Sequence, residues 1–125
     1  MTHLGILIGA LYCALAVAAG AFGAHGLAGR LDARSLDLWE TAARYLMYTG
    51  LGLLAVGVLD QLWHERLLTA AAGSLALGGL VFSGTVFALA LGGPRVLGAV
   101  TPLGGLLLIA GFLAVAWTAI ARHLD

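Results

Sequence analysis

The most prominent pattern in the chain is a succession of long uncharged segments separated by short polar ones. Residues 4–24, 45–59, 67–94 and 96–121 contain no charged side chain. A helix needs roughly 20 apolar residues to cross the hydrocarbon core of a bilayer, which is about 30 Å thick. The pattern therefore predicts an all-α integral membrane protein, a four-helix bundle with helices at about 4–24, 33–61, 67–91 and 102–122.

The second uncharged segment is short for a span, and its expected helix is extended toward the N-terminus by local signals. Asp32 is a favourable N-cap residue, and no helix-breaking residue follows it before Gly50. We therefore expect the first turns of this helix to lie at the membrane surface. The helix enters lipid near Tyr45 and Tyr48, because aromatic rings with a polar tip favour the interface.

A different signal marks the expected start of the fourth helix. Thr101 followed by Pro102 fits an N-cap residue with proline at the first helical position. Residues 92–100 are then expected to form a connection at the membrane interface.

Composition supports a membrane protein and excludes a soluble one. Hydrophobic residues make up 62% of the chain and charged residues only 10%, with a mean hydropathy of +1.04; soluble domains carry about 25% charged residues. The whole chain, 1–125, is expected to form one transmembrane domain. The first segment lacks a positively charged start and exceeds a signal peptide's apolar region, so we expect a retained helix.

The few charges bear on partners and orientation. The six arginines balance six acidic residues, and no lysine is present. Without a basic patch, we expect no nucleic-acid partner. With four spans, four of the arginines fall on the side of the first and third loops, and two fall on the side of the termini. The positive-inside rule therefore predicts that those two loops lie in the cytoplasm and that both termini lie outside it. The arginines of the larger group are Arg30, Arg34, Arg44 and Arg95.

Small residues are frequent, with 19 glycines in the chain. Helices in lipid associate by close packing and hydrogen bonds, for which small residues four positions apart are suited. Such spacing predicts a compact bundle, and it occurs at Gly5/Gly9, Ala16/Gly20, Ser74/Gly78, Gly79/Ser83 and Thr101/Gly105.

One candidate polar cluster lies where the first two expected helices approach the same membrane surface. His25 ends the first span between glycines, and Glu40, Arg44 and Tyr48 begin the second. Glu40 and Arg44 stand four residues apart, so they are expected to pair on one helix face. Such a cluster suits the binding of a proton, a lipid headgroup or a quinone head. The structural alternative is a hydrogen-bonded network that fixes the first loop to the bundle.

Signatures of catalysis and of cofactors are missing from the sequence. No catalytic motif of the common hydrolase, protease, redox or phosphate-binding types occurs, and we expect no enzyme. A bis-histidine haem would need two histidines at membrane depth, and only His25 comes near it. His3, His64 and His123 share one expected side, but terminal and loop histidines usually face solvent, so neither a metal nor a cofactor is expected.

Four sequence blocks resemble a known family. AFGAHGL (21–27), WETAARYLMY (39–48), FSG (82–84) and LGAVTPLGG (97–105) occur in the order and spacing of domain-of-unknown-function family 423, small four-helix membrane proteins. The resemblance implies four spans and a location in the inner membrane of a bacterium, but no established activity. Where members often carry a histidine after the second block, this chain has Thr49, which favours packing or binding over proton chemistry.

These observations favour a non-catalytic membrane protein. The expected role is an accessory or assembly subunit, or a lipid-interacting scaffold, with membrane lipids, a second copy or a larger complex as partners. The alternative is a small-solute transporter or channel formed by a homo-oligomer, with Thr49, Ser83 and Thr85 as its polar series. The transporter or channel role requires Thr49 and Ser83 to line one water-accessible path, whereas the scaffold role does not.

Overall fold

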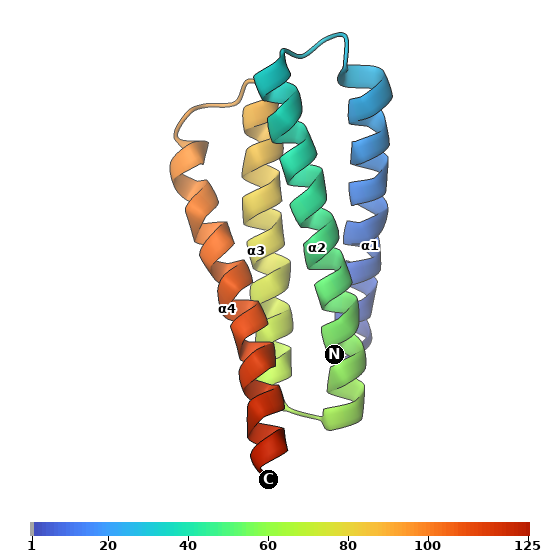
Figure 1. The fold of residues 1–125 in the computed structure, drawn as a ribbon, viewed down its shortest axis with the longest axis vertical. Coiled ribbons are helices and arrows are strands. Elements are labelled where there is room, and N and C mark those ends of the chain that lie inside the picture. Colours follow the sequence, from blue (N-terminus) through green and yellow to red (C-terminus); the bar gives the residue numbers. More distant parts are fainter. Residues whose placement is uncertain (1) are drawn as a thin grey trace.

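A computed structural model describes residues 2–125, and almost all of them are helical. The elements are α1 (Thr2–Phe22), a π-helical turn η1 (Gly23–Leu27), α2 (Ala33–Trp63), α3 (Arg66–Ala90) and α4 (Leu97–Leu124). The four long helices alternate in direction, so both termini and the α2–α3 turn lie at the same end (Figure 1). Each helix is long and apolar enough to cross a membrane. The four-helix prediction is confirmed.

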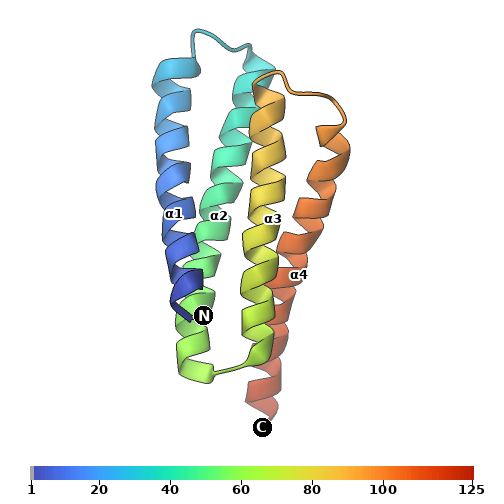
Figure 2. The same cartoon turned by 180° about the vertical axis from the view of Figure 1, so that it is seen from behind.

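The helices are arranged in chain order as an open row. α1 packs on α2, α2 on α3 and α3 on α4, while α1 and α4 make no contact within the described residues. Both sides of the molecule show the same order (Figures 1 and 2). The four-helix bundle predicted from the sequence is therefore open between α1 and α4. Lipid is as apolar as leucine, so no hydrophobic driving force closes the row in a membrane.

Neighbouring helices approach each other closely at glycines. A Cβ atom built on Gly9 of α1 would lie 2.8 Å from the carbonyl oxygen of Gly50 in α2. In the same way, a Cβ on Gly104 of α4 would lie 2.5 Å from the backbone nitrogen of Phe82 in α3. The prediction of close packing holds at Gly9, but a Cβ on Gly20 would meet nothing within 4 Å.

Local signals explain how α2 begins and how α2 and α3 end. The Asp32 side chain accepts the backbone N–H of Ser35 at 2.8 Å, which confirms it as the N-cap of α2. That helix ends at His64, whose φ of 53° is left-handed. At the end of α3, Gly92 has a φ of 92°, and the N–H of Gly93 donates to the Ala88 carbonyl. This is a Schellman motif, which needs a residue such as glycine in the left-handed region.

Two helix bounds differ from the sequence-based expectation. The first helix continues as a π-helical turn through Leu27 instead of ending near residue 24. α4 begins at Leu97, so Pro102 lies inside it and residues 97–101 are helical rather than part of a connection. Pro102 is in the second turn, where it removes only one backbone hydrogen bond. The Thr101 hydroxyl donates to the Leu97 carbonyl at 2.9 Å, and this bond stabilises the first turn of α4.

Candidate functional site

Three of the six predicted site residues lie exposed at the end of the bundle opposite the termini. The side chains of His25, Glu40 and Arg44 make no hydrogen bond or ion pair with any described residue. The expected Glu40–Arg44 pair is therefore wrong. An exposed pair of this kind contributes only about 0.3–0.5 kcal/mol, too little to hold two solvated side chains together. Within residues 2–125 the one ion pair joins Arg122 to Glu65 at 3.0 Å, at the other end.

Trp39 holds α1 against α2 and α3 near this end. Its indole N–H donates to the Ala19 carbonyl of α1 at 2.7 Å. The ring occupies the space that Gly23 leaves, since a Cβ there would lie 2.6 Å from the indole. It also packs edge-on against Phe22 and Phe87, with ring centroids 6.1 and 4.6 Å away. Sequence analysis missed this residue; the available signal was a tryptophan in the first turns of α2, which were expected at the membrane surface.

Tyr48 and Thr49 belong to a long hollow between α2 and α4, with α3 as its floor, which we call the α2–α4 groove. Its volume is about 440 Å³. Three aromatic rings line one end: Tyr45 lies 4.8 Å from Phe82 and 5.3 Å from Tyr48, centroid to centroid. The remaining lining is apolar and comes mainly from α4. It consists of Gly105, Leu108, Ile109, Phe112 and Leu113.

Thr49 and Ser83 are buried at the α2–α3 interface, and each donates its hydroxyl to a main-chain carbonyl. Thr49 bonds to the Tyr45 carbonyl at 2.8 Å, and Ser83 bonds across the interface to the Ala42 carbonyl at 2.9 Å. Their exposed fractions are 0% and 1%. The Thr49 methyl group fills the space beside Gly79, whose Cβ would lie 2.6 Å from it. Both hydroxyls are therefore used within the α2–α3 interface.

Ser83 borders a second hollow on the opposite side of the row, between α1 and α3, which we call the α1–α3 groove. This groove has a volume of about 310 Å³ and includes Trp39 and Phe87. Tyr12 of α1 crosses the groove at one end, and its hydroxyl donates to the Ala76 carbonyl of α3 at 2.7 Å. Thr49 and Ser83 thus line separate grooves rather than one path. The six predicted residues do not form a single site.

No three side chains of His, Cys, Asp or Glu gather within the part of the chain that the structure describes. His3, His64 and His123 are exposed. The arrangement offers apolar grooves and satisfied hydroxyls, which suit contact with hydrocarbon rather than bond-making chemistry.

Comparison with known proteins agrees with this architecture. The sequence model of a family described as "Protein of unknown function (DUF423)" matches residues 19–105. The chain belongs to the DUF423 family. This confirms the resemblance inferred from the four sequence blocks, and the matched segment contains all six predicted site residues.

Similar DUF423 proteins are named only as membrane proteins. A UPF0382 membrane protein of Staphylococcus haemolyticus is 47% identical over 108 residues, covering 86% of this chain and 88% of that one. The UPF0382 membrane protein YwdK of Bacillus subtilis is 39% identical over 116 residues, covering 92% and 94%. No solved structure matches the fold. The family thus indicates a membrane protein with bacterial relatives, without a specific biochemical role.

Proposed function

We propose that this DUF423 protein is a non-catalytic scaffold of the bacterial cytoplasmic membrane that holds phospholipid acyl chains in its lateral grooves. The observation that carries the proposal is the α2–α4 groove, a hollow of about 440 Å³ with an almost wholly apolar lining. Its opening lies on the lateral surface of membrane-spanning helices, where hydrocarbon is the available occupant. The exposed rings of Tyr45 and Tyr48 suit the boundary between headgroups and acyl chains.

The hydroxyl groups at membrane depth support a non-catalytic role. Thr49, Ser83 and Thr118 are buried, and each donates to a backbone carbonyl. Thr85 and Thr101 bond to each other at 2.6 Å. Hydroxyls used in this way stabilise helix packing and are not free to orient a reacting group.

The same geometry counts against the transporter or channel alternative. A path for a polar solute needs successive polar groups along one channel. Thr49 and Ser83 border different grooves, and the side chains of both residues are buried.

Orientation and assembly complete the proposal. The arginine distribution favours placing the α1–α2 and α3–α4 connections in the cytoplasm and both termini outside. Only 11% of the membrane-spanning window of α1 is buried within one copy of the chain. This helix therefore offers a surface for lipid, for a second copy, or for a larger membrane complex.

Filling the groove tests the proposal. A Cβ on Gly105 would meet only the Phe82 ring, at 3.7 Å, which is ordinary van der Waals contact, so Gly105→Leu adds a side chain at the lining of the groove. Gly98→Leu is the matched control on the same helix, because a Cβ there meets nothing within 4 Å. Native mass spectrometry of protein purified in mild detergent is expected to show at least about twofold fewer retained phospholipids for Gly105→Leu than for Gly98→Leu. Equal retention would contradict the proposal.

A further inference from the structure

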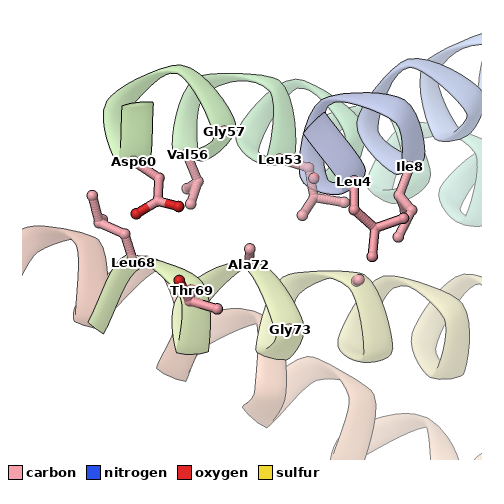
Figure 3. Close-up of a pocket in the computed structure, with 12 residues that line it drawn as sticks. Leu4, Ile8, Leu53, Val56, Gly57, Asp60, Leu68, Thr69, Ala72 and Gly73 are labelled. Carbon is pink, nitrogen blue, oxygen red and sulfur yellow. The ribbon is translucent and has the colours of Figure 1, made fainter. Parts of the chain in front are cut away.

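An acidic side chain borders a third hollow, at the end of the bundle where the termini lie. Asp60, in the last turn of α2, is half-buried and lines a partly open cavity of about 120 Å³ between α1, α2 and α3. Figure 3 shows its carboxylate pointing from α2 toward α3, where Thr69 lies. We call this cavity the Asp60 pocket. Asp60 directly follows the uncharged segment 45–59 and is not among the six predicted site residues.

The Asp60 carboxylate has no counter-ion in the part of the chain that the structure describes. The one ion pair among these residues joins Arg122 to Glu65 at 3.0 Å, and no side-chain hydrogen bond reaches Asp60. A negative charge in the last turn of a helix is also disfavoured by the helix dipole. The carboxylate therefore does not stabilise α2, and its charge is available to a cation from outside the chain.

Beyond the carboxylate the pocket is apolar. Its wall continues from Asp60 past Val56 to Leu53, two helical turns or about 10 Å along α2. Leu4 and Ile8 of α1 face this wall (Figure 3). A cationic group with an apolar extension fits such a cavity better than a small water-soluble amine, which would leave the apolar wall without contacts.

We infer that the Asp60 pocket binds the primary ammonium headgroup of an aminophospholipid, with the carboxylate of Asp60 and the hydroxyl of Thr69 accepting its N–H groups. Arg66 lies three residues before Thr69 on α3, so the two are neighbours on the helix surface. Its guanidinium complements the phosphate of the same headgroup. This inference rests on the proposed lipid-binding function. It concerns a different pocket from the α2–α4 groove, and it specifies which class of phospholipid is bound.

The test is a lipid titration of delipidated protein in detergent, followed by the midpoint of thermal unfolding. The probes are phosphatidylethanolamine, its N-methylated counterpart phosphatidylcholine, phosphatidylglycerol without an ammonium group, and ethylammonium chloride. We expect phosphatidylethanolamine to stabilise the protein at about tenfold lower concentration than the other two lipids. Asp60→Asn is expected to abolish this preference, while Asp37→Asn, an exposed aspartate on the same helix, retains it.

A second variant separates loss of the site from loss of the fold. A Cβ on Gly73, in the pocket wall, meets nothing within 4 Å, so Gly73→Leu fills the cavity and is also expected to abolish the preference. Persistence of the preference in Asp60→Asn or in Gly73→Leu would overturn the inference, as would equal stabilisation by ethylammonium alone. Gly105→Leu is expected to keep the preference, so failure of the groove proposal and failure of this one give different results.

Discussion

Gly104 is expected to be the position where one added methyl group most directly disturbs the α3–α4 interface. A Cβ there would lie 2.5 Å from the backbone nitrogen and 2.9 Å from the Cα of Phe82, and 3.0 Å from the carbonyl oxygen of Gly78. All three are backbone atoms, which cannot rotate away as a flexible side chain can. Gly104→Ala therefore requires α3 and α4 to separate.

The magnitude follows from two opposing effects. Overpacking costs typically about 1–3 kcal/mol, whereas alanine is up to about 1 kcal/mol more favourable than glycine inside a helix. For Gly104→Ala the two effects sum to a loss of about 0–2 kcal/mol in the free energy of unfolding. For Gly84→Ala in α3 a Cβ meets nothing within 4 Å, so only the gain from the higher helix propensity of alanine remains.

The assay is reversible unfolding of both variants by sodium dodecyl sulfate in mixed micelles, followed by circular dichroism. We expect Gly104→Ala to be less stable than Gly84→Ala by about 1–3 kcal/mol, because the helix-propensity gain is common to both variants and cancels. Equal stability of the two variants would refute the close backbone contact between α3 and α4.

Three further perturbations have defined outcomes. The Ser35 N–H lowers the pKa of the Asp32 carboxyl below 3.8. The charge of Asp32 thus stabilises the fold above that pH, and the stability difference between wild type and Asp32→Asn should disappear in thermal scans as the pH falls through the lowered pKa. Tyr12→Phe removes the hydrogen bond to Ala76 and should cost about 1 kcal/mol in the same micelle assay; no change would show that the bond contributes nothing. Arg122→Gln breaks an exposed pair and should cost less than about 1 kcal/mol, so a larger loss would contradict its solvated character.

The helices were predictable because their signals are local. Uncharged segments of membrane-spanning length gave the four spans, and Asp32 gave the start of α2. The start of α4 was misplaced because Pro102 fits two positions, the first helical residue or the second turn. The Thr101 hydroxyl and the bonds around Leu97 decide between them, and no sequence rule reports those contacts.

The sites were less predictable because they depend on which helices lie side by side. Small-residue spacing indicates that helices approach, but not that the row stays open between α1 and α4. The position of Trp39 opposite Gly23, and of Asp60 opposite Thr69, follows from the register between neighbouring helices, which sequence signals do not report. His25, Glu40 and Arg44 were grouped by their expected depth alone, and depth does not bring side chains into contact.

Native mass spectrometry of the protein released from its own membranes, at its natural level, tests the central claim most directly. A scaffold that holds lipid in its grooves should carry bound phospholipid, whether it is released as a single chain, as a homo-oligomer or with a partner. A stoichiometric foreign subunit on a chain free of lipid would contradict the account and make the protein a component of a larger machine.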